Sequence, residues 1–229
     1  MDPFDKAHET AGETYGHFNS FMMCDDTKIF GKLAARTILL NSVKDVPGDI
    51  VECGVFKGTG MLSFLKLKKV LFSNSIKRVI GFDFFDTDKL IGLLYDNDKK
   101  QMKTLFEEGK FSHGVGSAED MGNMIRNAGF SEVDFELVAG DIRQTAYDFV
   151  TERPGFRISM LYMDLDLEQP TFCALDAFWN RVSKGGVVIL DEYAYHKWSE
   201  SAGVDRFFAD KDVTIRTLNF LCPTAYVVK

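Results

Sequence analysis

The sequence predicts an α/β fold in which helices cover both faces of a mostly parallel β-sheet. Short apolar segments alternate along the chain with segments whose apolar residues recur at helical spacing, which is the pattern of repeated strand–helix–strand units. The strand segments are rich in Val, Ile and Leu without apolar/polar alternation, as expected for strands buried on both faces. With 229 residues, 45% of them hydrophobic, the chain is long enough for one domain with a continuous core.

Residues 1–46 are expected to form an N-terminal cap and a helix ahead of the main domain. Residues 1–25 are polar with interspersed aromatic side chains and show no sustained period. Over about 26–42 the apolar residues recur at helical spacing, behind an aspartate that can cap a helix. Pro47-Gly48 then breaks the chain, and we expect the domain to span residues 47–229.

Within this domain we expect seven strands and an alternating layer of helices. The expected strands are 49–53, 78–82, 134–138, 158–163, 187–190, 213–217 and 225–228. The expected helices are 61–72, 118–128, 144–151, 171–182 and 199–208. Residues 84–116 show no obvious strand and are expected to form an insertion over the functional site, partly helical at 98–108.

The connection between the last two strands fixes the direction of the final one. Residues 218–223 are too few for a right-handed crossover helix, so the final strand should be antiparallel to its neighbours. A mostly parallel seven-stranded sheet that ends in an antiparallel hairpin is typical of the class I methyltransferase fold and distinguishes it from dehydrogenase-type Rossmann sheets.

The composition argues against nucleic-acid and membrane partners. A net charge of −7 and a pI of about 5.2 leave no extended basic surface to neutralise a phosphate backbone. The N-terminus is acidic where a signal peptide would be basic, and no apolar run approaches the roughly 20 residues that span a bilayer. The four cysteines form no CxxC pair and are expected to be free thiols. We expect a soluble cytoplasmic protein, with a homo-oligomer left open.

A glycine loop joins the first strand to the next helix and is the first candidate ligand site. Gly54, Gly58 and Gly60, with Thr59 between the last two, would let the backbone approach a ligand at the carboxyl edge of the sheet. Their spacing matches neither GxGxxG nor the Walker loop, which disfavours a polyphosphate. Glu52 would repel a phosphate but pair with an ammonium group, as in S-adenosylmethionine. The alternative is a tight turn with an incidental acid.

Two further acids follow strands and are candidates for the same cofactor. Asp83 ends the second strand, where a carboxylate can accept both ribose hydroxyls of an adenosine. Asp141 follows the third strand and could meet the adenine amino group or the ribose. It could equally cap the helix that begins near Gln144.

Acids also end the fourth and fifth expected strands. Asp164 and Asp166 follow one strand, Asp191 and Glu192 the other, and these strands should be neighbours about 5 Å apart. Carboxylates so close need a counter-charge, and Mg²⁺ prefers such oxygen ligands. We therefore expect Asp164, Asp191 and Glu192 to hold a divalent metal. The alternative is that Asp164 or Asp166 caps the helix that starts near Pro170, which would explain one acid but not four.

On these motifs the chain resembles the macrocin O-methyltransferase family, metal-dependent enzymes that methylate sugar hydroxyls of macrolide-type natural products. The resemblance runs from about residue 47 to 210. Its carriers are Val51-Glu52-Cys53-Gly54-Val55-Phe56-Lys57-Gly58, Gly81-Phe82-Asp83, Asp164-Leu165-Asp166-Leu167, and Lys184-Gly185-Gly186 leading to Asp191-Glu192-Tyr193.

The resemblance implies S-adenosylmethionine and Mg²⁺ as cofactors, a sugar or other saccharide as acceptor, and Asp164, Asp191 and Glu192 as metal ligands. Two departures matter. Glu192 replaces the second acid of the family's DDY segment, although glutamate also coordinates through oxygen. The family's DGDLYEST-like segment here lacks its tyrosine, which alters residues near the acceptor and leaves the acceptor's identity open.

Methyl transfer is an in-line displacement at a sulfonium, so catalysis would come mainly from positioning the acceptor oxygen and lowering its pKa. A metal chelated by two vicinal hydroxyls would do both, and a side-chain base would remove the proton. His196 is the nearest titratable candidate after Glu192, and Asp164 itself could serve. The alternative for residues 193–198 is an aromatic-rich loop that packs on the sheet.

Other functions compete with this one. A nicotinamide or nucleotide-sugar oxidoreductase would normally carry GxGxxG and Tyr-x-x-x-Lys, and residues 193–197 lack the second motif. A methyltransferase-like protein that methylates an amine or a non-sugar hydroxyl stays open. So does a non-catalytic scaffold, which would show no metal-dependent turnover.

Overall fold

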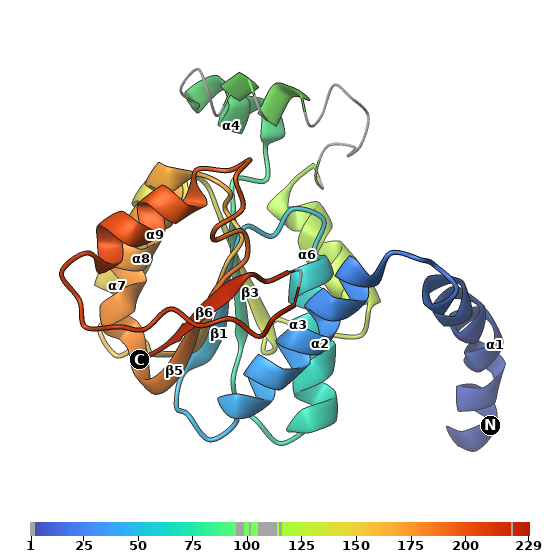
Figure 1. The fold of residues 1–229 in the computed structure, drawn as a ribbon. Helices are drawn as coiled ribbons and strands as arrows, with labels where there is room; N and C mark the ends of the chain where they lie inside the picture. Colours follow the sequence, from blue (N-terminus) through green and yellow to red (C-terminus); the bar gives the residue numbers. More distant parts are fainter. Residues whose placement is uncertain (1–2, 95–98, 101, 105–113, 115, 221) are drawn as a thin grey trace.

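The structure, a computed structural model, describes residues 3–94, 99–100, 102–104, 114, 116–220 and 222–229. Six strands in the order β3-β2-β1-β4-β5-β6 form its central sheet (Figure 1). They are β1 (Asp49–Cys53), β2 (Val79–Asp83), β3 (Phe135–Ala139), β4 (Ile158–Met163), β5 (Val182–Leu190) and β6 (Ala225–Val228). Strands β1 to β5 are parallel, and β6 pairs antiparallel with β5, which confirms the predicted class and the direction of the last strand.

The strand count of seven is wrong for the described chain, because residues 213–217 form no strand. Their apolar and polar side chains alternate as in a strand, but the segment meets β6 at one bridge only. Arg216 and Tyr226 exchange two backbone hydrogen bonds there, at 2.9 and 2.8 Å. A left-handed residue, Asn219 (φ 59°), then turns the chain. The segment therefore forms a single bridge and no ladder, although its sequence pattern is that of a strand.

Helices cover both faces of the sheet and divide the core into two apolar clusters (Figure 1). On one face lie α2 (Thr27–Ser42), α3 (Thr59–Leu71) and α6 (Ala118–Asn127), which contribute Leu40, Phe64 and Ile125 to the core. On the other lie α7 (Ile142–Glu152), α8 (Glu168–Phe178), the short 3₁₀ helix η1 (Trp179–Arg181) and α9 (Glu200–Phe208). The helix expected at 171–182 is therefore shorter, since β5 begins at residue 182.

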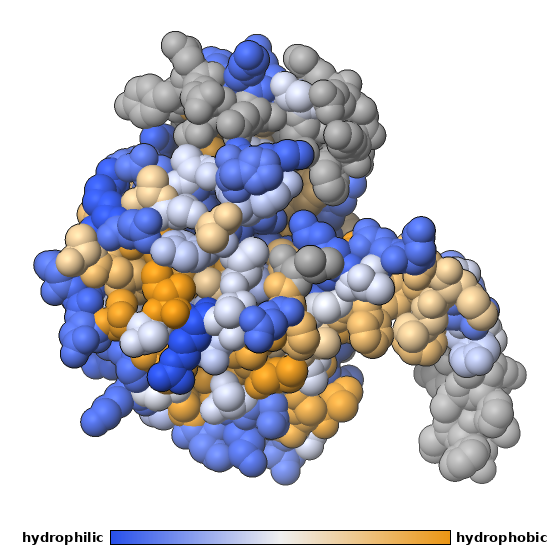
Figure 2. All heavy atoms as spheres, viewed as in Figure 1, coloured by the Kyte–Doolittle hydropathy of each residue, from blue (hydrophilic) through white to orange (hydrophobic). Residues whose placement is uncertain are grey.

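Two helices lie where the sequence predicted none. Residues 1–25 showed no period, yet α1 spans Pro3–Met22 and extends beside the domain in Figure 1. No side chain among residues 12–22 is buried, so this described part of the helix packs no apolar face against the domain. Figure 2 shows apolar side chains exposed along α2 and the adjoining end of α1. In the insertion, α4 (Thr87–Leu93) follows β2.

The helix expected at 98–108 is described in part. Residues 99–100 and 102–104 are helical, and the rest of that range lies outside the described residues. Because α4 begins four residues after β2 ends, the start of the insertion lies at the carboxyl edge of the sheet, where the predicted site residues also follow their strands.

Candidate functional site

The register of the central strands brings the predicted acids to one edge. Cys53 pairs with Met163, and Met163 pairs with Leu190, so the residues that follow β4 and β5 leave the sheet together. The ladder continues for one more residue, because the N–H of Asp164 donates to Cys53 O at 2.8 Å and that of Asp191 to Met163 O at 3.0 Å. The two carboxylates therefore start from adjacent backbone positions, as the sequence predicted.

Asp191 is fully buried, and both of its carboxylate oxygens have partners. The hydroxyl of Tyr162 donates to Oδ1. Oδ2 accepts from Lys32 Nζ at 2.7 Å and from Cys222 Sγ at 3.1 Å. Burial alone would raise the pKa of Asp191, but the ammonium of Lys32 and these hydrogen bonds outweigh it and lower the pKa below its usual value. Asp191 is thus an ionised carboxylate in a closed environment.

Lys32, on α2, supplies the positive charge of this site. Its Nζ lies 3.2 Å from Asp164 Oδ2 as well as 2.7 Å from Asp191 Oδ2, so one ammonium bridges the two acids. Burial would lower the pKa of Lys32, but the two carboxylates raise it well above its usual value. Lys28, one turn earlier, lies 3.9 Å from Glu192. The chain itself thus supplies part of the counter-charge that these acids need.

A pattern in α2 could have indicated this contact. Lys28, Lys32 and Arg36 are spaced by four residues, which puts three cations on one face of the helix. All three reach the strand ends, since the Arg36 guanidinium carbon lies 4.8 Å from the ring centre of Tyr162. The pattern gives no partner, however, because the contacts join residues 132 and 159 positions apart.

Burial and repulsion between neighbouring carboxylates favour the protonated form of the remaining acids of the site. Burial, with the charge of Asp191, raises the pKa of Asp164 to about 6 and that of Glu192 to about 7. Burial and neighbouring acids also raise the pKa of Asp166 and of Glu200 well above the usual range. Lys28, Lys32 and Arg36 only partly oppose the pKa shifts of Asp164 and Glu192.

Glu200, at the start of α9, was missed by the sequence analysis. It is fully buried, and its Oε1 accepts from the backbone N–H of Glu192 at 3.1 Å. Its Oε2 has no hydrogen-bond partner among the described residues. No local pattern distinguished this acid from an ordinary residue of a helix first turn.

Neither aspartate after β4 caps the following helix, so that alternative is wrong. Leu167 is the N-cap of α8 and makes no side-chain capping bond. The hydroxyl of Ser199 accepts from the N–H of Glu168 at 2.9 Å instead. Asp164 therefore faces the site, and Asp166 has a left-handed backbone (φ 63°).

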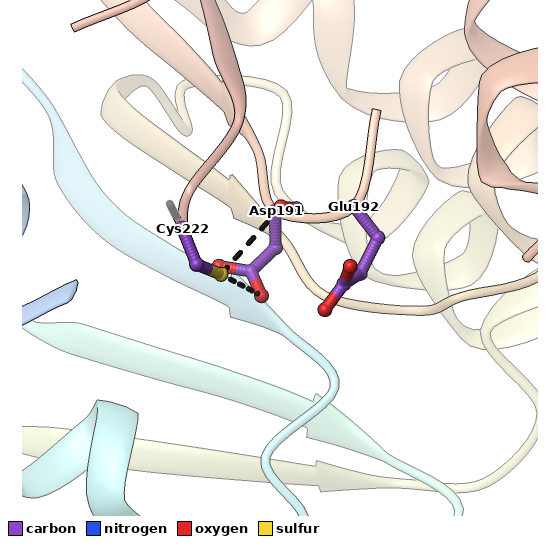
Figure 3. A group of neighbouring side chains, drawn as sticks. All are labelled: Asp191, Glu192 and Cys222. Carbon is purple, nitrogen blue, oxygen red and sulfur yellow. Dashed lines mark hydrogen bonds between the residues drawn. The ribbon is translucent and has the colours of Figure 1, made fainter. Parts of the chain in front are cut away.

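Three side chains in the described chain converge closely enough to hold one metal ion. One ligand atom from each of Asp191, Glu192 and Cys222 lies within 4.8 Å of the other two (Figure 3). Cys222 was also missed, although the predicted antiparallel last strand points to it. Because β6 begins opposite Leu190, the residues just before β6 must lie at the carboxyl end of β5. Asp164 joins the same site through Lys32.

Glycines let the backbone and an acid pack closely at the end of β1. A Cβ on Gly54 (φ 94°) would lie 1.9 Å from the backbone oxygen of Asp164, and one on Gly60 would lie 1.5 Å from Glu52 Oε1. Gly58 (φ 80°) is the N-cap of α3, and Thr59 is the exposed first residue of that helix. Gly54 and Gly58 are therefore favoured by both space and a left-handed backbone, and Gly60 by space alone.

Glu52 lies buried against the first turn of α3. It is 1% exposed, and its Oε2 has no hydrogen-bond partner among the described residues. Burial raises the pKa of Glu52 to about 8, and the nearby Arg36 guanidinium only partly opposes this. The carboxyl group is therefore largely neutral at pH 7, and one of its oxygens is buried without a partner among the described residues.

The other predicted cofactor residues have partners within the chain. Asp83 Oδ2 accepts from the N–H groups of Val55 and Phe56 at 2.7 and 2.8 Å, and its Oδ1 from that of Phe85 at 2.9 Å. Asp83 therefore holds the glycine loop in place.

Asp141 caps α7, and His196 lies on the surface. The Asp141 carboxylate accepts from the backbone N–H of Arg143 at 3.0 Å and pairs with its guanidinium, so the capping alternative describes its contacts. The His196 ring is exposed and meets Tyr195 edge-on, 5.2 Å between ring centres. Its environment gives it no contact with the acids.

The strand order, with an antiparallel strand at one edge and a glycine loop after β1, defines the class I methyltransferase fold. A solved O-methyltransferase, NovP, shares this fold with a TM-score of 0.68 at 23% identity, over 87% of this chain and 79% of that one. No helix among the described residues is long and apolar enough to cross a membrane.

The family model for macrocin O-methyltransferase (TylF) matches residues 32–220, so the chain belongs to that family, as the sequence motifs predicted. CalS11, a TDP-rhamnose 3'-O-methyltransferase of calicheamicin biosynthesis, is 27% identical with a TM-score of 0.66, over 86% of this chain and 78% of that one. A tetracenomycin rhamnosyl 4'-O-methyltransferase of Streptomyces olivaceus is 26% identical over 149 residues, 65% of this chain. The match spans 54% of that relative, about half its length.

Proposed function

We propose that this protein transfers a methyl group from S-adenosylmethionine to a hydroxyl of a sugar, in a glycosylated natural product or a polysaccharide, with help from Mg²⁺ or another divalent cation. The observation that carries the proposal is the meeting of two unlike acidic sites at one sheet edge: a buried carboxyl beside a glycine loop, and a group of acids after β4 and β5 in which Asp191 is paired with Lys32. CalS11 and the tetracenomycin methyltransferase named above act on rhamnose units, which supports a sugar acceptor.

Glu52 would bind the ammonium group of the cofactor. Its unpartnered Oε2 can accept a hydrogen bond, and an ammonium beside it would favour the ionised form. Asp83 would contribute less to ribose binding than the sequence predicted. A carboxylate offers about four acceptor positions, and three backbone N–H groups take three of them. Asp83 can therefore accept one ribose hydroxyl while it holds the loop, but not both.

The acids after β4 and β5 fit a hard divalent cation. Their donors are carboxylate oxygens. Burial, and then the charge of Asp191, raise the pKa values of Asp164 and Glu192, and a bound cation would favour the ionised form of both groups. Asp164, Asp191 and Glu192 would hold the ion, as the family resemblance implies, and Cys222 lies within reach. Such an ion, when bound, would orient the acceptor hydroxyl and lower its pKa.

Asp164 is the better candidate for the base that removes the hydroxyl proton. A pKa of about 6 leaves it mostly ionised at neutral pH and able to accept a proton. Asp164 also lies among the acids of the site, where Lys32 bridges it to Asp191. His196 would have to move from its exposed position beside Tyr195 to play this part. We therefore place His196 second.

Calorimetric titration with S-adenosylhomocysteine tests the cofactor assignment. The purified protein should bind S-adenosylhomocysteine both with Mg²⁺ and with a chelator, because Glu52 and the glycine loop are separate from the acids after β4 and β5. NADH should not bind. NADH binding of comparable strength would contradict the assignment and favour an oxidoreductase.

A further inference from the structure

Lys32 holds the position that a divalent cation needs. The ammonium nitrogen contacts Asp191 Oδ2 at 2.7 Å and Asp164 Oδ2 at 3.2 Å, so it lies between the two acids that would bind the ion. Mg²⁺ binds oxygens at about 2.1 Å. An ion that reaches both carboxylates would overlap the ammonium group, and the two cations exclude each other.

The hydrogen bonds of Asp191 show which of its oxygens an ion beside Asp164 would take. Its Oδ1 already accepts from Tyr162, a buried side chain packed edge-on against Phe64. Oδ2 is the oxygen that faces Lys32. Cys222 also donates to Oδ2, at 3.1 Å. A metal ion that binds Asp191 through Oδ2, beside Asp164, must therefore displace Lys32 from that oxygen, while the bond from Tyr162 can stay.

The side chain of Lys32 can move toward solvent when it leaves the two acids. Its side chain is 24% exposed, whereas that of Asp191 is fully buried, so Lys32 lies on the solvent side of the pair. The rest of α2 is fixed by side chains further along, because Ala35, Leu39 and Leu40 are buried against the sheet and α3. Release of Lys32 would therefore affect the first turns of α2 and leave its second half in place.

We propose that Lys32 is an internal counter-cation that competes with the divalent ion for Asp164 and Asp191, so that α2 sets the metal affinity of the site. This inference rests on the metal site of the proposed function. Coupling between two binding events is reciprocal. Lys32 weakens metal binding, and metal binding in turn loosens the start of α2.

Direct Mn²⁺ binding, followed by electron paramagnetic resonance without acceptor, tests the competition. Lys32→Met should bind Mn²⁺ about tenfold more tightly than the parent, within the usual range of coupling between two sites. Lys32→Gln keeps a hydrogen-bond donor but no charge and gives a second measurement should the Met variant fold poorly. Lys44→Met is the matched control, because Lys44 is 57% exposed and its ion pair is with Asp45. It should bind as the parent does.

The outcomes separate this inference from the proposed function. Equal or weaker Mn²⁺ binding by both Lys32 variants, with the parent also binding, overturns the competition alone. No Mn²⁺ binding by any protein, with S-adenosylhomocysteine still bound, overturns the metal site and the competition together. Hydrogen exchange gives an independent readout: Mn²⁺ should speed exchange over residues 27–33 of the parent but not of Lys32→Met.

Discussion

The carboxyl edge of the sheet has two halves, the first after β1 and β2 and the second after β4 and β5. Each half buries a carboxyl group, but the two groups have different partners. After β1 and β2, backbone N–H groups satisfy Asp83, while Glu52 lies buried with one oxygen unpartnered. After β4 and β5, Asp191 is equally buried but is paired with a lysine. Burial raises the pKa of Glu52 to about 8, whereas Lys32 lowers the pKa of Asp191. Burial alone therefore does not decide whether a carboxyl group here is charged.

The different charge states of Glu52 and Asp191 suit the two carboxyl groups to different ligands. A neutral carboxyl with a free oxygen can receive a cationic ligand and ionise when the ligand arrives. An ionised carboxylate already held by a cation must exchange one cation for another. The first half is suited to the ammonium of a cofactor, and the second to a metal that competes with Lys32. The predictions below test whether the two halves are independent.

Asp191→Asn should have the largest effect on methyl transfer and should leave cofactor binding in the first half unchanged. The change keeps the size of the side chain but removes the charge that Lys32 and a metal ion share, so methyl transfer should fall by about 100-fold or more. S-adenosylhomocysteine affinity should stay nearly unchanged. Asp205→Asn is the control, an exposed acid that contacts Tyr193. A fully active Asp191→Asn enzyme would show that the acids have no part in turnover.

Glu52→Gln should change how stability depends on pH. Because burial raises the pKa of Glu52 from 4.5 to about 8, the folded protein keeps a proton that the unfolded chain loses in this range. Glu52 therefore makes the free energy of unfolding fall as pH rises from 4.5 to about 8, by roughly 1.4 kcal/mol per pKa unit at most.

Urea unfolding of the parent and of Glu52→Gln at about pH 5 and about pH 9 measures this effect. The variant should gain stability relative to the parent at the higher pH, by a few kcal/mol. Acids that do not interact with Glu52 titrate alike in both proteins and cancel in the difference. A parent-to-variant difference that is the same at both pH values would show that Glu52 is ionised throughout.

Gly60→Ala should weaken cofactor binding in the first half of the site and leave the acids after β4 and β5 unchanged. The new Cβ would meet Glu52 Oε1, so the carboxyl group must move from its place against α3. We expect S-adenosylhomocysteine to bind about tenfold more weakly, the loss of one charge-assisted hydrogen bond. Gly155→Ala is the control, because nothing lies within 4 Å of its Cβ. Unchanged affinity in Gly60→Ala would remove Glu52 from the cofactor site.

Asp141→Ala should have the smallest effect. Loss of the N-cap of α7 should lower the free energy of unfolding by about 1 kcal/mol. S-adenosylhomocysteine affinity should not change if capping is the whole role of Asp141. A loss of affinity of tenfold or more would instead support the predicted contact with adenine or ribose.

Most of the fold could be predicted from the sequence because its signals are local. Apolar strands, the break at Pro47 and the cap at Asp26 each depend on a few neighbouring residues. The exceptions have no such signal or a misleading one. The helix α1 has no buried face in its described side chains, and residues 213–217 alternate like a strand but form one bridge.

The candidate site divides in the same manner. Asp164, Asp191 and Glu192 could be placed together because residues after adjacent parallel strands share an edge. Lys32 could not be assigned to them, since its contacts span 132 and 159 residues and depend on how α2 packs. The partners of Asp83 likewise depend on the exact path of the glycine loop, which spacing alone does not give.

Methyl transfer from labelled S-adenosylmethionine, with and without a chelator, tests the central claim most directly. The acceptors would be nucleotide-linked and glycosylated sugars, with matched amines alongside. We predict transfer to a sugar hydroxyl in the presence of Mg²⁺, loss of transfer in excess chelator, and recovery when Mg²⁺ is restored. Transfer at an undiminished rate in excess chelator, or transfer to the amines alone, would contradict the account.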